Sequence, residues 1–385
     1  MRTLVRWLAV SMATMVASAC RPAAAPCPPQ ARPDVRLPAS PPDATPPLER
    51  RMDGLFAAYA HGVRPGYAVG IVREGRLVFG KGYGYADIEQ RRPITADTAF
   101  NLASLSKQFT AATIALEIEA GRLTLDDPLS AHWPDLPSFA REITLAHLVY
   151  MTSGLPEYYT LPSPKGGWSS ENRFTVDDAI GAVLGAGELR YTPGTRWEYS
   201  NINYQLLAVL AGRLHGVSFA ERSATAVFQP LEMTHTWVDA PVQLDRPERA
   251  RAYVWEDDGW TEAPRLSPHY GGSGVFSSLE DLARWDTALY HSAALGEGWS
   301  KRMLSTRRFE HDKDNDAFGL VLGSYEGMDT IWYEGGDYGV STYMARLPQR
   351  DTTVICLSNF GHGGCWGKAQ AVIDTLVAMD AAPQP

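Results

Sequence analysis

Residues 101–111 have the sequence Asn-Leu-Ala-Ser-Leu-Ser-Lys-Gln-Phe-Thr-Ala, which predicts the start of a helix with Ser104 and Lys107 on one face. Residues three apart on a helix have Cβ atoms about 5–6 Å apart, so the amine of Lys107 is expected beside the hydroxyl of Ser104. The first-turn N–H groups and the positive end of the helix dipole favour an alkoxide or an oxyanion there. Ser104 is therefore a candidate nucleophile. The alternative is a polar helix start in which Ser104 is a cap and Lys107 points into solvent.

A second polar motif lies at residues 193–201, Pro-Gly-Thr-Arg-Trp-Glu-Tyr-Ser-Asn, in a loop before a predicted helix. Tyr199 can act as a general acid or base when a nearby cation stabilises its phenolate, and Lys107 is the candidate cation. The alternative is an aromatic loop that packs on the following helix.

The third motif, Trp332–Thr342, is rich in glycine but is bounded by predicted strands. Glycine inside a strand pattern often marks the close approach of another backbone or of a ligand. An edge strand that lacks side chains at Gly335 and Gly336 can offer backbone N–H groups to a substrate carbonyl. A plain β-bulge is the alternative.

Hydrophobic periodicity predicts strands at both ends of the folded region and helices between them. The predicted strands are residues 67–73 and 76–85, joined by the turn pair Glu74-Gly75, and residues 318–323, 330–333, 341–347 and 353–358. The predicted helices are residues 48–61, 104–121, 176–187, 203–215, 279–290 and 367–379. The expected fold is α/β (α+β), with a mostly antiparallel sheet built from both chain ends, flanked by helices, and a helical subdomain inserted at about residues 104–265. A functional site is expected in the cleft between sheet and insert.

In this order and spacing the motifs resemble the serine β-lactamase and penicillin-binding-protein superfamily, specifically the class C β-lactamase-related branch with its esterase, D-aminopeptidase and DD-peptidase relatives. Further matching stretches are Gly82–Asp87, Leu123–Pro128, Thr152–Leu155, Gly271–Trp285 and Ile355–Asn359. The resemblance runs from about Leu48 to Met379. It implies a β-lactamase/transpeptidase-like fold and a serine hydrolase that uses no cofactor.

The resemblance also gives roles to the matching residues. It implies that Ser104 is acylated, that Lys107 and Tyr199 share proton transfer, and that Asn201 orients Lys107 or a substrate amide. It implies an oxyanion site between the backbone N–H groups of Ser104 and Gly336. The expected activity is cleavage of an ester or amide through an acyl-enzyme, with reactivity towards β-lactams left open.

Two residues depart from the pattern of the relatives. Tyr333 stands where relatives have His or Lys two residues before Gly335, so the substrate-binding strand lacks its usual cation. Met151 stands where many relatives have His before Thr-Ser-Gly. A neutral phenol can donate a hydrogen bond but cannot pair with a carboxylate as an ammonium does. We therefore expect an esterase or peptidase with an uncharged substrate end. The alternative is a catalytically weak or silent penicillin-binding-like module that binds cell-wall peptides or a partner protein.

The N-terminus predicts export. Residues 1–19 carry two arginines followed by an apolar run that ends in small residues, which is typical of a signal peptide. Cys20 follows in a stretch that resembles a lipoprotein cleavage box, so it is a candidate for lipidation. Residues 20–47 are rich in proline and predict an extended tether, leaving residues 48–382 as the hydrolase domain. The expected location is periplasmic or the outer membrane as a lipoprotein, or alternatively secreted.

Composition narrows the partners. The formal net charge is −9, which argues against a nucleic-acid surface, so a small-molecule or peptide substrate is expected. The histidines and cysteines lack zinc-binding spacing, so no metal is predicted. Export permits a disulfide between Cys356 and Cys365, but two buried thiols fit equally well. Residues 157–173 either roof the cleft or form a variable surface loop.

Overall fold

The computed structural model describes residues 46–162, 173–263, 268–306 and 315–381 of the 385-residue chain. The predicted signal peptide at 1–19, Cys20 and residues 21–45 of the predicted tether lie outside the described residues. Helix α1 begins at Pro46, two residues before the predicted start of the first helix at Leu48. Proline fits the first turn of a helix, where its missing N–H group would have no partner in any case.

Helices and strands come in blocks along the chain. The helices are α1 Pro46–Leu55, α2 Lys107–Glu119, α3 Leu129–His132, α4 Leu145–Val149, α5 Val176–Gly185, α6 Asn201–Arg213, α7 Phe219–Ser223, α8 Leu279–Tyr290, α9 Glu297–Met303 and α10 Cys365–Ala381. The strands are β1 Tyr67–Arg73, β2 Arg76–Tyr83, β3 Tyr85–Asp87, β4 Arg92–Pro93, β5 Phe100–Asn101, β6 Trp237–Val238, β7 Tyr253–Glu256, β8 Gly259–Glu262, β9 Val275–Ser277, β10 Asn315–Asp316, β11 Val321–Tyr325, β12 Met328–Asp337, β13 Val340–Leu347 and β14 Thr352–Ser358.

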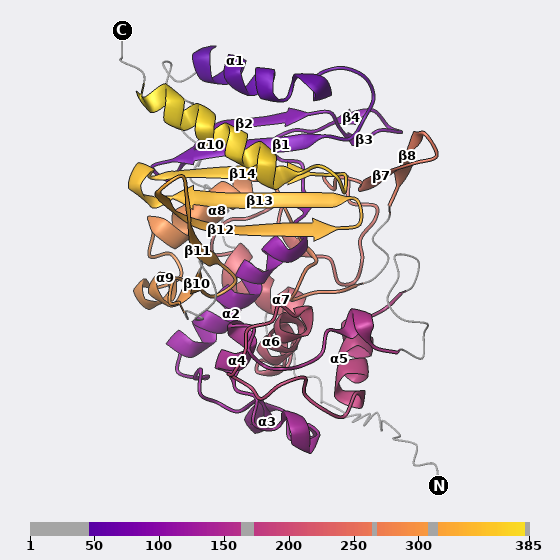
Figure 1. Cartoon of the computed structure of the whole chain (residues 1–385), viewed down its shortest axis with the longest axis vertical. Coiled ribbons are helices and arrows are strands. Elements are labelled where there is room, and N and C mark those ends of the chain that lie inside the picture. The colour runs from indigo at the N-terminus through magenta and orange to yellow at the C-terminus, as the bar shows by residue number, and fades with distance from the viewer. Residues whose placement is uncertain (1–45, 163–172, 264–267, 307–314, 382–385) are drawn as a thin grey trace, which may run out of the picture. The chain divides into compact units, whose positions relative to one another are not determined.

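The main sheet is antiparallel and has the strand order β10-β11-β12-β13-β14-β1-β2 (Figure 1). Strands β1 and β14 pair with Tyr67 opposite Ser358, so strands from the two ends of the described chain are neighbours inside the sheet. Helices α1 and α10 cover one face and α8 packs on the other. The predicted fold class, a mostly antiparallel sheet from both chain ends with helices on it, is confirmed.

Strand β1 shows how the sheet joins two cores. Tyr67, Val69 and Ile71 belong to the apolar cluster under α1 and α10, whereas Ala68 and Val72 belong to the cluster shared with α8 and the helical region. Side chains alternate between faces along a strand. Because both faces are covered, β1 is apolar at nearly every position and is almost wholly buried.

Two boundaries follow from local backbone signals. Glu74 and Gly75 both have positive φ (50° and 69°), which suits the two-residue turn of a β1–β2 hairpin. Helix α2 ends where Gly121 takes a φ of 69° and the Arg122 N–H donates to the carbonyl of Glu117. This is the Schellman arrangement that glycine permits after a helix.

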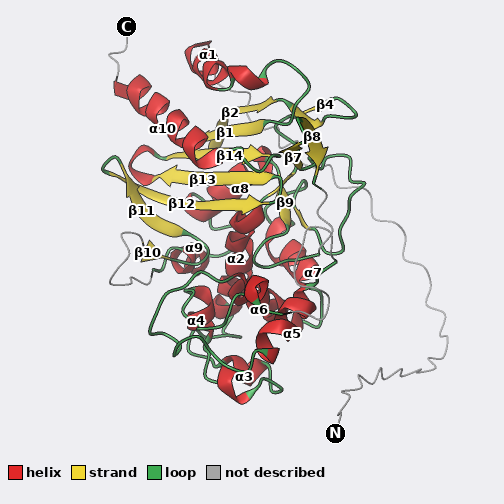
Figure 2. Cartoon of the chain, turned by 45° about the vertical axis from the view of Figure 1, so that its right-hand side comes forward, coloured by secondary structure: helices red, strands yellow, loops and turns green. Residues whose placement is uncertain are grey.

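The predicted helical insert at about 104–265 is wrong in its last part. Helices α2 to α7 lie below the sheet (Figure 2), but the last part contains β6 at residues 237–238 and the β7–β8 hairpin at residues 253–262. The hairpin turns at Asp257 and Asp258, whose φ values are 48° and 61°. An Asp-Asp pair is a weaker turn signal than one that contains glycine, so the hairpin was not apparent in the pattern.

Other bounds also differ from the predictions. The strand predicted at 330–333 continues through the glycine pair to Asp337, and the helix predicted at 48–61 ends at Leu55 and is followed by a short 3₁₀ turn, Ala57–Tyr59. Cys356 and Cys365 are both buried free thiols, and no disulfide joins them. None of the described helices combines the length and apolar character needed to cross a bilayer.

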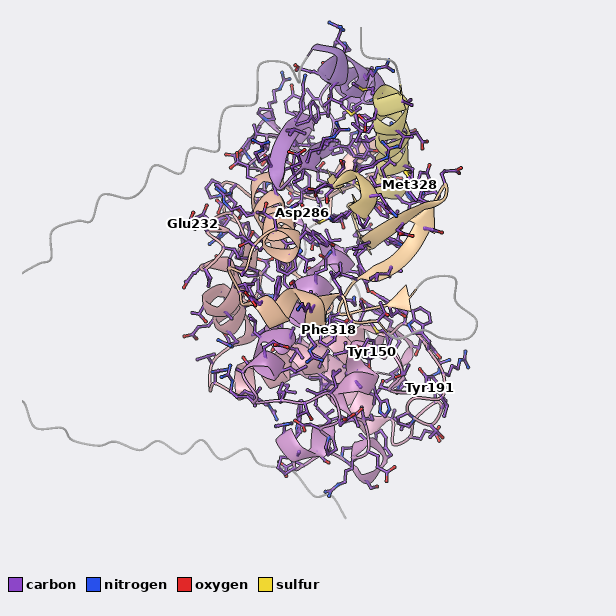
Figure 3. The ribbon with its side chains drawn as sticks, turned by 90° about the vertical axis from the view of Figure 1, so that its left-hand side faces the viewer. Tyr150, Tyr191, Glu232, Asp286, Phe318 and Met328 are labelled. Carbon is purple, nitrogen blue, oxygen red and sulfur yellow. The ribbon has the colours of Figure 1, made fainter. Side chains whose placement is uncertain are left out.

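A buried polar cluster ties α8 to the sheet. Asp286, labelled in Figure 3, accepts hydrogen bonds from the hydroxyl of Thr353 (2.5 Å) and from Nη1 of Arg346 (3.2 Å). Burial raises the pKa of the Asp286 carboxyl to about 6, against the lowering effect of the Thr353 hydroxyl and the Arg346 charge. The folded state therefore holds this proton more tightly than the unfolded state, in which a carboxyl has a pKa of about 3.9.

We expect this group to make stability fall as the pH rises from about 4 to about 6. Its contribution is complete below the unfolded pKa and is lost above the folded one, with an amplitude on the order of 2–3 kcal/mol. Chemical denaturation across pH 4 to 7 gives the dependence of the unfolding free energy on pH for wild type and for Asp286→Asn. The fall assigned to Asp286 should be absent from the variant. Asp258→Asn, at the exposed hairpin turn, is the control and should keep the wild-type slope. A wild-type slope in Asp286→Asn would contradict the assignment.

Candidate active site

Ser104 lies in a 3₁₀ turn, Ala103–Ser106, rather than in the first turn of an α-helix as predicted. Helix α2 begins only at Lys107. The turn is closed by the Leu105 N–H donating to the Leu102 carbonyl at 3.0 Å. It runs directly into α2, so the hydroxyl of Ser104 still lies at the N-terminal end of that helix.

The residue before Ser104 has an unusual backbone. Ala103 takes a φ of 47°, in the left-handed region that costs an L-residue roughly 1–2 kcal/mol. The side-chain oxygen of Asn101 accepts the Ala103 N–H at 3.0 Å and so holds this conformation. Backbone strain of this kind is found at functional sites, where surrounding structure keeps it in place.

The three predicted catalytic side chains meet in the structure. The Oγ of Ser104 lies 2.7 Å from the hydroxyl of Tyr199, and Nζ of Lys107 lies 3.2 Å from Ser104 Oγ and 2.6 Å from the Tyr199 hydroxyl. Lys107 is 0% exposed, whereas Tyr199 is 38% exposed. The phenol of Tyr199 thus lines the cavity, and the buried amine of Lys107 donates a hydrogen bond to its hydroxyl.

Lys107 has more acceptors than it can serve at once. Besides Ser104 and Tyr199, it donates to the Asn201 side-chain oxygen at 2.8 Å and to the Gly272 carbonyl at 2.7 Å. An ammonium has three donors, and four oxygens lie around this one. At any moment one of the four oxygens therefore accepts no hydrogen bond from Lys107. When that oxygen belongs to Ser104 or Tyr199, the 2.7 Å hydrogen bond between the two hydroxyls can take its place. The arrangement therefore suits movement of a proton between the two hydroxyls.

The glycine pair of β12 passes close to the nucleophile. A Cβ at Gly335 would lie 2.4 Å from the Leu102 carbonyl oxygen, 2.4 Å from the Thr342 hydroxyl and 3.0 Å from the Ser104 nitrogen. Only glycine permits this approach. Gly336 has open space around it and lines the same cavity as Ser104. The predicted oxyanion site between the Ser104 and Gly336 N–H groups stays a prediction, but both residues border the space where it would lie.

The sequence predicted that the glycine pair lies on an edge strand, but β12 lies between β11 and β13. It pairs with β11 as far as Trp332 and with β13 along the stretch from Ile331 to Asp337. The last five residues of β12 therefore have a described partner strand on one side, so this portion alone behaves as a local edge beside the cavity.

Tyr333 stays a predicted substrate-binding residue, but it does not line the cavity. It is buried among the apolar side chains that the sheet shares with the helical region, and it is not among the residues that line the cavity. Tyr333 and Gly335 lie on the same face of β12. At Gly335 that face packs against Leu102 and the turn that carries Ser104. Burial raises the pKa of the Tyr333 phenol well above its usual range. It is therefore neutral, and the usual cation of this strand is indeed missing.

The loop that carries Tyr199 is held by residues that sequence reasoning did not assign. Oε2 of Glu157 accepts the backbone N–H of Asn201 at 2.6 Å, at the start of α6. Burial raises the pKa of Glu157, while the Asn201 N–H and the charge of Lys107 act against it. The carbonyl of Met151 accepts the Glu198 N–H at 2.9 Å. These contacts join stretches more than 40 residues apart, for which the sequence gives no local signal.

The site opens into a cavity of about 240 Å³ between the sheet and the helical region. Its wall includes Phe100, Asn101, Ser104, Tyr159, Tyr199, Leu244, Gly336, Asp337 and Tyr338. Tyr159 shows that the described start of the 157–173 loop borders the cleft, whereas residues 163–172 lie outside the described residues. Within the described residues, no group of His, Cys, Asp or Glu is arranged to hold a metal ion.

Known proteins are similar to this chain in sequence and in fold. Penicillin-binding protein 4* of Bacillus subtilis is 31% identical over 74% of the chain and 66% of its own length, and a Beta-lactamase of Escherichia coli is 33% identical over 57% and 55%. A D-aminopeptidase of Gluconobacter oxydans is 26% identical over 77% of the chain and 56% of its own length. The chain thus spans about half to two thirds of the length of these relatives.

Solved structures agree with this similarity. D-amino acid amidase from Ochrobactrum anthropi superposes with a TM-score of 0.73 at 22% identity, covering 87% of the chain and 100% of the amidase. A penicillin-binding protein from Bacillus halodurans gives a TM-score of 0.72 at 25% identity, covering 87% and 99%. The family model described as Beta-lactamase matches residues 51–374. Since that match spans most of the chain, the protein belongs to the Beta-lactamase family.

Proposed function

We propose that the protein is a serine hydrolase that cleaves an ester or amide through an acyl-enzyme on Ser104. The observation that carries the proposal is the contact of Ser104 Oγ with both Tyr199, at 2.7 Å, and Lys107, at 3.2 Å, at the wall of a cavity. A serine hydroxyl becomes a nucleophile when an adjacent base accepts its proton. The names of the relatives, which include a Beta-lactamase, a D-aminopeptidase and a D-amino acid amidase, support the same class of reaction.

The acylation step uses the three side chains in turn. The Lys107–Tyr199 pair accepts the Ser104 proton while Oγ forms a bond to the substrate carbonyl carbon. The resulting oxyanion would lie between the N–H groups of Ser104 and Gly336, where each donor is typically worth about 3–4 kcal/mol. The same proton then passes from Tyr199 to the leaving alcohol or amine as its bond to carbon breaks. The acyl group remains on Ser104.

Deacylation repeats these steps with water as the nucleophile. Tyr199 accepts a proton from the attacking water, and that proton returns to Ser104 Oγ when the ester bond to the enzyme breaks. Asn201 keeps Lys107 in place throughout, because its side-chain oxygen accepts from the amine at 2.8 Å. The buried, neutral Tyr333 offers no cation for a substrate carboxylate, which favours substrates that are uncharged at that end.

Covalent labelling tests the proposal directly. Incubation with a fluorophosphonate should add one adduct to the intact protein by mass spectrometry, and peptide mapping should locate it on Ser104. Hydrolysis of a panel of p-nitrophenyl esters and amino-acid amides should accompany the labelling. A protein that stays unlabelled and turns over none of the panel would instead be the silent binding module that the changes at Tyr333 and Met151 suggest.

Replacing Tyr199 by phenylalanine is expected to lower kcat by about 10²-fold, the usual contribution of a positioned acid–base group. The variant keeps the ring and removes only the hydroxyl that contacts Ser104 and Lys107. Steady-state kinetics on a p-nitrophenyl ester measure the change. Tyr338→Phe, a cavity tyrosine whose hydroxyl donates to Glu256, is the matched control and should remain within a few-fold of wild type. Equal rates for the two variants would mean that the proton passes elsewhere.

We also infer that the protein is exported, with Cys20 as the candidate lipid anchor, on the signal-like character of residues 1–19 and the proline-rich stretch that follows. Intact mass spectrometry of the protein recovered from cells distinguishes the outcomes. A cleaved, diacylglycerol-modified N-terminus at Cys20 that is lost in Cys20→Ser supports anchoring. Cleavage without lipid supports a periplasmic or secreted protein, and retention of residues 1–19 would contradict export.

A further inference from the structure

One carboxylate at the cavity wall, that of Asp337, has no cationic partner in the part of the chain that the structure describes. Oδ1 of Asp337 accepts the backbone N–H of Tyr338 at 2.8 Å, and Oδ2 accepts the side-chain amide of Asn101 at 3.3 Å. Both donors are neutral. Among the described residues, no Lys, Arg or His nitrogen lies within ion-pair distance of Asp337. An ionised carboxylate can accept about four hydrogen bonds, so this one has capacity left for a ligand.

Asp337 is placed at the reacting centre by the elements already described. It follows Gly336 directly, so their Cα atoms are about 3.8 Å apart. Its side chain is on the same strand face as Gly335, the face that packs against the turn carrying Ser104. Asn101 fixes it there, because its side-chain oxygen accepts the Ala103 N–H and its amide is left to donate to Asp337.

The two arginines of the cavity wall each form ion pairs with carboxylates. Arg249 pairs with the buried carboxylate of Asp239 at 2.7 Å. Arg251 pairs with Asp87 and with Glu262, each at 2.8 Å. Each arginine is thus balanced or outnumbered by neighbouring carboxylates, and Asp337 adds a further negative charge to this part of the wall.

Aromatic rings surround the same space. Tyr159, Tyr199 and Tyr338 all line the cavity with exposed side chains. Rings attract a cation near their faces, by an amount that grows as water is excluded. A carboxylate beside several phenols is therefore a favourable setting for an organic cation.

We propose that Asp337 is a specificity-determining residue that binds an ammonium group of the substrate, so that the preferred substrates are amine-bearing esters or amides. The inference rests on the proposed hydrolase function and names the substrate class of the same site. It also fits the buried, neutral Tyr333: the site lacks a cation for a substrate carboxylate and holds an anion for a substrate amine. Asn101 acts through Asp337 as a positioning residue.

The test compares two esters that differ in the ammonium alone. The p-nitrophenyl esters of phenylalanine, each enantiomer separately, and of 3-phenylpropanoate are hydrolysed at pH 6 and low ionic strength, where the amine is protonated and screening is weak. The measured quantity is the ratio of kcat/KM for the amine ester to kcat/KM for the neutral ester. Asp337→Asn should lower this ratio about tenfold for the preferred enantiomer, since a charge-assisted hydrogen bond becomes a neutral one. Intrinsic ester reactivity and the fraction of folded enzyme cancel in the comparison.

The matched control is Glu334→Gln, which removes one carboxylate from the opposite face of the same strand. It should leave the ratio within twofold of wild type. A ratio unchanged in Asp337→Asn, or lowered equally by Glu334→Gln, would overturn the proposal. Equal losses on both esters in Asp337→Asn also leave the ratio unchanged and would show a role in positioning alone.

A binding measurement separates this inference from the proposed chemistry. Calorimetry with 2-phenylethylammonium and with 2-phenylethanol should show tighter binding of the cation to wild type, and Asp337→Asn should remove the difference. If wild type hydrolyses neither ester and Ser104 takes no label, the hydrolase proposal fails while a cation preference that depends on Asp337 still supports the amine site. Equal binding of the two ligands would overturn it.

Discussion

Replacing Ser104 by alanine is expected to lower kcat for ester hydrolysis by about 10³-fold or more and to abolish the fluorophosphonate adduct. Residues that act as one catalytic unit lose most of their joint effect when any one member is removed. Here the unit is tight, because Ser104 Oγ contacts Tyr199 and Lys107 at once. What remains should be the weak rate that binding and an oxyanion site sustain without a nucleophile.

Ser273→Ala is the control for this variant. Ser273 lines the same cavity, so the change removes a hydroxyl from the same surroundings but outside the Ser104–Lys107–Tyr199 cluster. It should keep the adduct and most of the turnover. Undiminished turnover in Ser104→Ala would remove the acyl-enzyme proposal altogether, whatever the fold.

Replacing Gly335 by alanine is expected to destabilise the protein by roughly 1–3 kcal/mol or more and to lower kcat by about 10²-fold. The added Cβ would lie 2.4 Å from the Leu102 carbonyl oxygen, a backbone atom that cannot move without shifting the turn that carries Ser104. Overpacking of a tight site carries a cost of this size. Moving the strand away would also displace the Gly336 N–H from the predicted oxyanion site, where one donor is worth about 10²–10³ in kcat.

Gly336→Ala makes the comparison sharp. Nothing lies within 4 Å of a Cβ built at Gly336, so this neighbouring substitution should leave the unfolding midpoint near that of wild type. Thermal unfolding of the two variants gives the difference in stability, and active-site titration corrects kcat for folded enzyme. Equal stabilities for the two alanine variants would contradict the proposed steric conflict between a Cβ at position 335 and the Leu102 carbonyl.

Much of the fold could be predicted because its signals are local. The β1–β2 hairpin follows from alternation around Glu74-Gly75, and the end of α2 follows from Gly121. The β7–β8 hairpin was missed, since it turns on two aspartates and its strands are only four residues long. The 3₁₀ turn at Ser104 was missed as well, because the positive φ of Ala103 depends on the side chain of Asn101.

The site shows the same division. The clustering of Ser104, Lys107 and Tyr199 could be predicted. Helical spacing links Ser104 to Lys107, but only the family resemblance links the loop of Tyr199 to the helix of Lys107. The burial of Tyr333 outside the cavity wall could not be predicted from the sequence, because it depends on what packs against each part of β12. Glu157 was not assigned for a similar reason. Its partner is the backbone N–H of Asn201, and because nearly every residue type has a backbone N–H, this contact gives no sequence signal.

The pairing of β1 with β14 has a consequence for how the chain acquires its structure. Val69 lies opposite Cys356 in this pair, so one strand pairing of the sheet joins residues almost the whole length of the domain apart. Long-range pairings of this kind slow folding, since a large loop must close before they form. Until the last strand emerges from the ribosome, β1 and β13 have no common neighbour, and the surface that positions the glycine pair beside Ser104 is incomplete. The sheet that carries the site is therefore completed only after the C-terminal region has been synthesised.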